Sequence, residues 1–282
     1  MRNPIPILPT LSPLLLLAAC DVTPADDAGA NAAAAMASET NIAADALSSR
    51  PTPQAAPPAP AASAFEAETP DYQFSYSYPA AAAAIPALNA WLESDRKKTR
   101  AELARDAAGY HREATRDGFP FRQYSHTSEW MVVTETPRLL SLSNQFNVYT
   151  GGAHGSPGFE ALVWDKQASR RLLPIDMFQS PAALQKAVGA RFCDLLDAER
   201  TKRRGEPVVR NNGDTFNECI PITDATLILG SSNRRAIDRL GFLIGPYSAG
   251  SYAEGTYDLT IPVNAAVLAT VKPQWREAFA AR

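Results

Sequence analysis

The residues best able to do chemistry in this 282-residue chain are few, because it contains only three histidines and three cysteines. His154 lies in a glycine-rich stretch, Tyr149–Gly155, with the sequence Tyr-Thr-Gly-Gly-Ala-His-Gly. An imidazole there could act as a general base or bind a ligand. The alternative is a structural histidine that hydrogen-bonds the carbonyl groups of a turn. Nothing near it in the sequence supplies a nucleophile or a metal-ligand spacing.

The elements around this stretch are predicted from alternation. Residues 138–149 alternate apolar and polar side chains, which predicts a half-buried strand, and residues 159–164 predict a second strand. Glycine adopts backbone conformations that other residues avoid, so we expect a sharp connection between the two strands. Loops of this kind often carry function. The candidate binding loop therefore consists of Tyr149, Gly151, Gly152, His154 and Gly155.

Known catalytic motifs do not occur in the sequence. It contains no H-E-x-x-H metal motif and no G-x-S-x-G nucleophile motif. His111 and His126 are the other imidazoles, and Asp165 or Asp176 could join His154 in a site. The sequence supplies no geometry for such a site, so it predicts no catalytic residue, no metal site and no cofactor.

The N-terminus has the features of a lipoprotein signal peptide. Arg2 precedes an apolar run that ends at Leu17-Ala18-Ala19-Cys20, so we expect residues 1–20 to be a signal peptide and Cys20 to be lipidated. An ordinary secretory signal cleaved elsewhere is the alternative. Lipidation would hold the protein on the periplasmic side of the cell envelope. Asp21 resembles an inner-membrane retention signal, but the choice between inner and outer membrane stays open.

The other two cysteines, Cys193 and Cys219, are then expected to face an oxidising compartment. A disulfide between them would contribute about 3 kcal/mol by closing the intervening loop. Two buried free thiols are the alternative.

Composition divides the rest of the chain. Half of residues 21–68 are Ala or Pro, which predicts a disordered tether, and residues 69–282 are expected to fold as one domain. The folded part carries 25 Lys and Arg against 23 Asp and Glu. This near-neutral balance, without a basic patch, argues against nucleic acid. The basic cluster at residues 200–210 is expected to be a solvated helix end.

Periodicity predicts a mixed fold. We expect an opening strand at residues 72–78, helices at 86–108 and 181–204, and further strands at 124–134, 226–229, 240–244 and 257–263. The aromatic face of the opening strand could be core or could stack on sugars. Most connections between strands are too short for parallel crossovers. The expected class is α+β, a largely antiparallel sheet with two main helices packed on one side.

Several motifs together carry a resemblance to a known pair of modules. The glycine-rich stretch is followed by Trp164-Asp165, by Leu173-x-x-Asp176-Met-Phe178, and later by Gly245-Pro246-Tyr247-x-Ala-Gly250. This pattern resembles the extracytoplasmic modules shared by the anti-sigma factor RsiV and the N-terminal region of the peptidoglycan deacetylase PdaC. The first module would span residues 71–147 and the second residues 149–268. Pro246, Tyr247 and Gly250 form the second family motif.

The resemblance implies a function in the envelope. RsiV binds lysozyme through this region, whereas the chemistry of PdaC resides in a separate metal-dependent domain whose motif this sequence lacks. We therefore expect a lipid-anchored, non-enzymatic binding module for a cell-wall glycan or for an envelope protein such as a lysozyme-like muramidase. The alternatives are a cryptic envelope hydrolase that uses His154 and a structural partner in an envelope complex.

Overall fold

The computed structural model describes residues 61–282, which belong to one compact unit. The predicted signal peptide, Cys20, Asp21 and most of the predicted tether lie outside the described residues. Within the described part of the chain, no helix combines the length and the apolar character needed to cross a membrane.

The first half of the described chain forms a six-stranded sheet and the long helix α2 (Pro86–Asp117), which follows the one-turn helix α1 (Ala80–Ala83). The strands lie in the order of the sequence, and only β2 and β3 pair in parallel, because α2 forms the crossover between them. Their bounds are β1 (Ser63–Glu68), β2 (Tyr72–Tyr78), β3 (Tyr124–Glu135), β4 (Leu139–Tyr149), β5 (Ser156–Asp165) and β6 (Arg170–Leu172).

The second half forms a three-stranded antiparallel sheet and the helix α3 (Pro181–Arg204). Ser180 caps the N-terminus of α3, since its hydroxyl accepts a hydrogen bond from the Ala183 N–H. Its strands are β7 (Thr226–Gly230), β8 (Arg239–Ile244) and β9 (Tyr257–Pro262), and α4 (Ala265–Thr270) follows them. Short 3-10 helices complete this half: η1 (Pro174–Met177), η2 (Thr215–Asn217), η3 (Ile222–Asp224), η4 (Tyr252–Glu254) and η5 (Pro273–Ala278).

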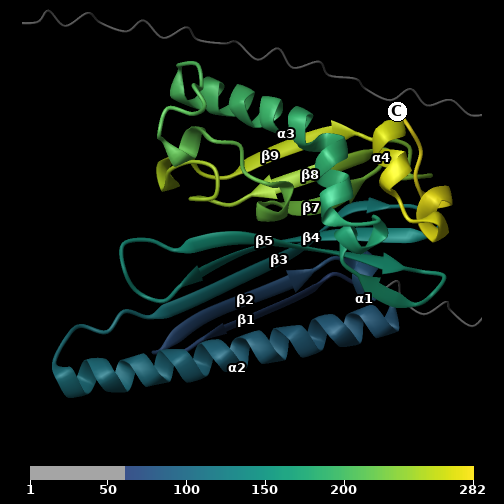
Figure 1. The fold of residues 1–282 in the computed structure, drawn as a ribbon. Helices are drawn as coiled ribbons and strands as arrows, with labels where there is room; N and C mark the ends of the chain where they lie inside the picture. The colour runs from purple at the N-terminus through teal and green to yellow at the C-terminus, as the bar shows by residue number, and fades with distance from the viewer. Residues whose placement is uncertain (1–60) are drawn as a thin grey trace, which may run out of the picture. The chain divides into compact units, whose positions relative to one another are not determined.

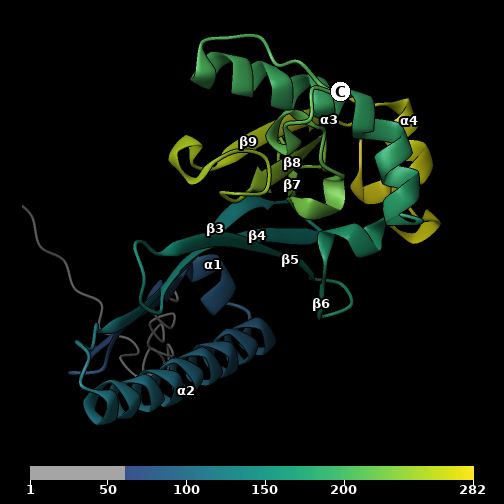
Figure 2. The same cartoon turned by 60° about the vertical axis from the view of Figure 1, so that its left-hand side comes forward.

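These elements stack in layers. Helix α2 packs on β2 and β3, strand β7 packs on β3, β4 and β5, and α3 packs on β9 (Figures 1 and 2). The predicted α+β class with a largely antiparallel sheet is confirmed. The detailed arrangement differs from the prediction, because there are two sheets and each long helix covers its own sheet. Periodicity fixes which face of a helix is buried but not which sheet it is buried against.

The aromatic face of β2 belongs to the core. Tyr72, Phe74, Tyr76 and Tyr78 are all buried, and they form one apolar cluster with residues of α2 and β3. The core interpretation of this stripe is therefore correct, and stacking of sugars on it is excluded.

Two expectations about strands are corrected. Residues 63–68, predicted to be part of the tether, form the edge strand β1, in which Phe65 packs edge-on against Phe74 and lies under the Arg96 guanidinium. An Ala-rich strand with one aromatic residue has too weak an apolar pattern to be recognised. Strand β4 was expected to be half-buried, yet residues 139–144 are buried on both faces, because the second sheet covers the face that carries Ser141 and Ser143.

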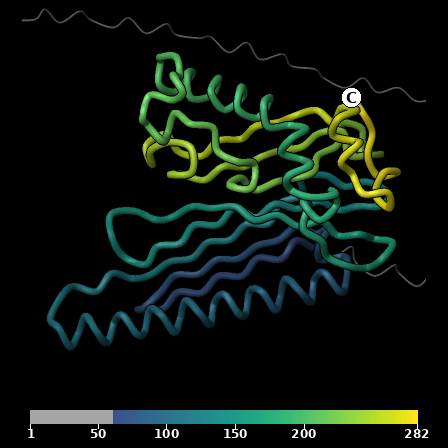
Figure 3. Tube along the Cα trace, viewed as in Figure 1, coloured from purple at the N-terminus to yellow at the C-terminus, as the bar shows by residue number. Residues whose placement is uncertain are grey.

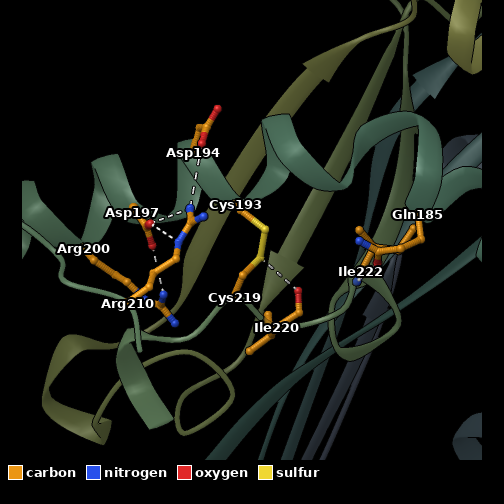
Figure 4. Close-up of a disulfide and its surroundings, with 9 residues drawn as sticks. All are labelled: Gln185, Cys193, Asp194, Asp197, Arg200, Arg210, Cys219, Ile220 and Ile222. Atoms are coloured by element: carbon orange, nitrogen blue, oxygen red, sulfur yellow. Dashed lines mark hydrogen bonds and ion pairs between the residues drawn. A yellow bond between two sulfur atoms is a disulfide. The ribbon is translucent and has the colours of Figure 1, made fainter. Parts of the chain in front are cut away.

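The predicted disulfide between Cys193 and Cys219 is present (Figure 4). It links residues 26 apart and ties the segment that leads to η3 onto α3. The basic cluster beside it is not a simple solvated helix end. Arg200 is fully buried and donates to the Ala249 carbonyl, because the segment before η4 folds over this part of α3.

Candidate functional site

The glycine-rich stretch forms the predicted sharp connection, here between β4 and β5. Gly151 and Gly152 have φ angles of +97° and +92°, which residues with a side chain rarely adopt. At Gly155 a Cβ atom would lie 2.7 Å from the Asn147 side chain. Gly151 and Gly152 are therefore required by the backbone path, whereas a side chain at Gly155 would require the Asn147 side chain to move.

The structure brings this loop against the second family motif. The His154 Nε2 atom lies 3.3 Å from the Tyr247 hydroxyl, and the His154 ring stacks on Tyr252 with centroids 3.7 Å apart. We call His154, Tyr247 and Tyr252 the loop cluster. The two segments, far apart in the sequence, lie at the same end of the trace (Figure 3). Tyr247 is 58% exposed and has a φ of +67°, and its N–H donates to the Gly250 carbonyl.

The groups of the loop cluster satisfy one another. The Nδ1 atom of His154 lies 2.9 Å from the Gly155 carbonyl oxygen, and the Tyr252 hydroxyl donates to the same oxygen. Both ring nitrogens of His154 therefore have partners, and neither partner is a carboxylate. Such an arrangement holds a turn in place, as the structural interpretation of His154 expects.

The acidic residues considered as partners of His154 serve other turns. Asp165 accepts hydrogen bonds from the backbone N–H groups of the β5–β6 turn, and Asp176 accepts one from the Leu173 N–H. His111 pairs instead with Asp71 at 2.6 Å, and burial lowers the pKa of His126. The structure therefore does not assemble a histidine-based catalytic site from these residues.

Glu254 anchors the segment that carries Tyr252 of the loop cluster. It accepts hydrogen bonds from Arg204 Nε at 3.0 Å, from the Ser251 N–H at 3.0 Å and from the Tyr257 hydroxyl. Burial acts to raise the pKa of Glu254, but these hydrogen bonds and the Arg204 charge outweigh it and lower the pKa to about 2. The carboxylate is thus part of the fixed structure.

A cleft of about 430 Å³ lies elsewhere, where α2, the β5 edge and the second sheet meet. Its lining is mostly apolar, with two tryptophans and three charged residues, which is the usual make-up of a small-molecule site. The lining residues are Trp91, Asp95, Trp130, Glu160, Ala161, Arg171, Leu173, Pro174, Ile175, Pro181, Ile222, Thr223, Ala225, Thr226, Leu227 and Phe242.

The two carboxylates of the cleft are held by neutral donors. The Tyr76 hydroxyl donates to Asp95 at 2.8 Å and accepts from Trp130 Nε1 at 2.8 Å. The Asn144 amide donates to Glu160 at 3.1 Å. Among residues 61–282, no lysine or arginine nitrogen lies within 4.0 Å of either carboxylate. Both therefore remain available as acceptors for a ligand.

The pKa of Tyr76 reflects the same geometry. Burial raises it first, the adjacent Asp95 carboxylate raises it further, and Glu160 adds to the effect. The phenol therefore stays protonated and donates to Asp95 at any physiological pH. Both carboxylates of the cleft thus raise the pKa of one buried hydroxyl, that of Tyr76.

The aromatic part of the cleft is ordered by its own contacts. Trp91 and Trp130 pack edge to face with centroids 5.9 Å apart. The Arg171 guanidinium lies 4.6 Å from the Trp91 ring centroid, which is a favourable cation–π distance. Trp130 is almost fully buried, whereas Trp91 is partly exposed. Trp91 is therefore the ring that a ligand can reach.

The opposite wall of the cleft depends on the disulfide. The Ile222 N–H donates to Gln185 Oε1 at 2.8 Å, and Ile222 is buried. Cys219 lies three residues earlier and is bonded to α3 (Figure 4). The covalent link thus holds this wall against the helix.

No motif in the sequence predicts the cleft. Trp91 and Asp95 lie four residues apart and so share one face of α2. A carboxylate one turn from a tryptophan on the same helix face was the available signal. No local signal pointed to Glu160 or Arg171.

Comparison with known proteins supports the resemblance seen in the sequence. Residues 65–157 match the family model described as Deacetylase PdaC. The predicted resemblance is therefore confirmed: the segment from β1 to the start of β5 is similar to the PdaC family. No curated protein matches the chain.

Two of the solved structures that are similar to this chain are from the DUF3298 family. One is a protein from Bacteroides fragilis, with 16% identity, a TM-score of 0.46 and coverage of 71% of this chain and 89% of that chain. The other is from Pseudomonas aeruginosa PAO1, with 18% identity, a TM-score of 0.41 and coverage of 78% and 97%.

Proposed function

We propose that this protein is a lipid-anchored binding module of the cell envelope whose cleft takes a cell-wall glycan. The observation that supports the proposal is the cleft itself, which combines a reachable tryptophan with two carboxylates that have no cationic partner. Anchoring at Cys20 and a periplasmic location come from the sequence.

The chemistry of the cleft suits a sugar. The apolar C–H face of a pyranose packs on an aromatic ring, and its hydroxyl groups donate to carboxylates that are already oriented. Asp95 and Glu160 are fixed by Tyr76 and Asn144 before any ligand arrives, so little side-chain entropy is lost on binding.

A protein ligand such as a lysozyme-like muramidase, the first alternative, would contact a wider surface than one cleft. The alternative with a hydrolase would require His154 to act as a base, but both of its ring nitrogens are engaged in the loop cluster. A binding role for the cleft therefore has more support than either.

The test compares two aromatic truncations in the full chain, purified in detergent. Calorimetric titration with short peptidoglycan glycan strands should show binding by the wild type and a loss of affinity of about 10- to 100-fold in Trp91→Ala. Tyr247→Ala removes an exposed aromatic ring outside the cleft and should change the affinity less than twofold. The same samples, assayed for new reducing ends, report any hydrolysis.

The opposite pattern, in which Tyr247→Ala loses binding and Trp91→Ala does not, would move the site to the loop cluster. If the wild type binds no glycan but captures a muramidase, the ligand is a protein and not a glycan. Release of reducing ends by the wild type would make the protein an enzyme.

The anchoring part of the proposal has its own test. Cys20→Ser should release the protein from the membrane fraction or leave it unprocessed, because the acylated side chain is missing. Labelling by a palmitate analogue is the readout. Unchanged labelling and membrane association of the variant would contradict lipidation at Cys20.

A further inference from the structure

Strand β1 forms one edge of the six-stranded sheet and is open to further pairing. Within residues 61–282 it pairs only with β2, in a continuous register without a bulge (Figure 1). It contains no proline and no lysine, the residues that commonly protect an exposed edge. The outer side of β1 can therefore accept another strand.

The other edges of the two sheets are short, covered or blocked. Strand β6 is three residues long, and β7 packs on β3, β4 and β5. Strand β9 ends in Pro262, which has no N–H to donate. Among the described strands, β1 thus has the longest edge without such protection.

The register with β2 shows which backbone groups of β1 face outward. The Thr69 N–H donates to the Tyr72 carbonyl, so the odd-numbered residues of β1 bond to β2. The N–H and C=O groups of the even-numbered residues, from 62 to 68, therefore point away from the sheet. Each of these residues presents a donor and an acceptor on the same side, and the complement of such a row is an extended strand.

The sequence of β1 fits a second copy of itself. With a two-fold axis at Phe65, antiparallel pairing places Ala64 opposite Glu66 of the second copy and Ala62 opposite Glu68. Each of these pairs can exchange two hydrogen bonds, and no two like charges are directly opposed. An axis at Glu66 would place two carboxylates opposite each other, and an axis at Ala67 would oppose Glu66 to Glu68. Charge therefore selects the axis at Phe65.

The face of β1 that carries Phe65 has room for both copies. Helix α2 packs mainly on β2 and β3, and the long side chains of Arg96 and Arg100 reach over Phe65, 4.1 and 5.3 Å from its ring centroid. On the two-fold axis the two Phe65 residues would form a non-hydrogen-bonded pair, in which the Cα atoms lie about 4.5 Å apart. Aromatic residues stabilise cross-strand pairs of this kind.

We propose that β1 pairs antiparallel with β1 of a second copy, so that two six-stranded sheets become one continuous sheet. The expected lipid anchors would confine both copies to one membrane, which favours association through a short interface. The cleft lies beside β5, away from β1 in the strand order, so each copy keeps its cleft free. The pairing does not depend on which ligand the cleft binds.

The test traps the pair as a disulfide in the full chain, reconstituted in lipid vesicles. Phe65→Cys places two thiols opposite each other and should give a cross-linked dimer on mild oxidation, while Cys193 and Cys219 are already bonded to each other. Ala67→Cys, on the same face of β1, is the matched control. Its two copies would lie about 13 Å apart along the strands, too far for a disulfide, and should stay monomeric. Cross-linking of Ala67→Cys but not of Phe65→Cys would overturn the register.

A backbone variant in the Phe65→Cys chain tests the hydrogen bonds. Glu66→Pro removes the outward N–H of residue 66 but leaves the bonds to β2, since proline is tolerated on a strand edge. Trapping should fall at least about tenfold, because two intermolecular hydrogen bonds are lost. Glu66→Gln keeps the N–H and removes the charge, so it should trap at least as well as Phe65→Cys alone. Equal trapping in the two double variants would overturn the pairing.

The wild type gives an answer that does not require any variant to fold. Hydrogen exchange of the peptide that contains residues 63–68, measured in vesicles at low and high protein density, should slow severalfold at high density. Slow exchange at both densities would overturn the proposal and assign the edge to a segment of the same chain. Fast exchange at both densities would also overturn it, because no second copy would then occupy β1.

Discussion

The loop cluster and the cleft are built in opposite ways. In the loop cluster, His154, Tyr247 and Tyr252 use their polar atoms on one another and on backbone carbonyls. In the cleft, Asp95 and Glu160 are held from behind by neutral donors, and their remaining acceptor capacity faces open space. The polar atoms of the loop cluster are therefore already paired, whereas the carboxylates of the cleft can still accept hydrogen bonds from a ligand.

The difference shows what a sequence motif reports. Gly151, Gly152 and Tyr247 mark positive φ angles, which are requirements of the chain path. The cleft draws on α2, β5, the β5–β6 hairpin and the second sheet, whose residues are adjacent only after folding. The stretch that is most distinctive in the sequence is therefore the less open of the two regions.

The largest expected effect comes from the disulfide behind the cleft wall. Replacing Cys193 and Cys219 together by Ser should lower the free energy of unfolding by about 3 kcal/mol, because the 26-residue separation is no longer closed. Glycan affinity should fall as well, since η3 loses its tether to α3. Urea unfolding and calorimetry measure the two effects. Unchanged glycan affinity in a destabilised variant would show that the cleft wall does not depend on the disulfide.

The next effect concerns Glu254, which anchors the loop cluster. Its pKa of about 2 lies below the ordinary value of 4.5, so it adds to stability above pH 4.5 and that contribution is lost as the pH falls toward 2. The contribution is roughly 2 to 3 kcal/mol for a side chain that is 17% exposed. Glu254→Gln should lower stability at pH 7 and flatten the acid limb of a denaturation profile. The exposed Glu277→Gln is the matched control, and an equal change in both variants would contradict this role.

A smaller effect is expected at the glycine-rich loop. Gly152→Ala forces a Cβ onto a φ of +92° and should destabilise the protein by about 1 kcal/mol. Gly109→Ala makes the same change within α2, where the added Cβ meets nothing closer than 4.0 Å, and should stabilise by up to about 1 kcal/mol. Thermal melts of the two variants should therefore shift in opposite directions. A neutral Gly152→Ala would show that the loop is not held as described.

The smallest effect is expected for His154→Ala. It removes the exposed hydrogen bonds of the loop cluster and should reduce stability by about 1 kcal/mol or less. Glycan affinity should stay within twofold of the wild type, because His154 does not line the cleft. A loss of glycan binding with a normal melting temperature would show that the ligand site is the loop cluster and not the cleft.

Much of the local structure could be predicted from the sequence. Alternation located β2, β4, β5 and β9, and helical periodicity located α3. These features depend on neighbouring residues alone. The second sheet covering β4 could not be predicted, because the burial of Ser141 and Ser143 depends on a partner far along the chain.

The site was less predictable for the same reason. The sequence placed Tyr149, His154 and Tyr247 among the candidates, and the structure brings the loop and the second motif into contact. It gave no indication that Trp91 and Arg171 would meet or that Glu160 would face Asp95 across a cleft. Such a site needs the tertiary fold before it exists.

The six-stranded sheet limits where this protein can be divided into fragments. The two modules expected from the motifs meet near residue 148, but β5 and β6 complete the sheet that β1–β4 begin. A fragment that stops at residue 147 would expose the whole length of β4 as a new edge, with Leu140 and Leu142 beside it. Unprotected edges of this kind promote intermolecular strand pairing and aggregation. A fragment that ends at residue 147 is therefore expected to need a substitute for the missing strands β5 and β6 in order to stay soluble.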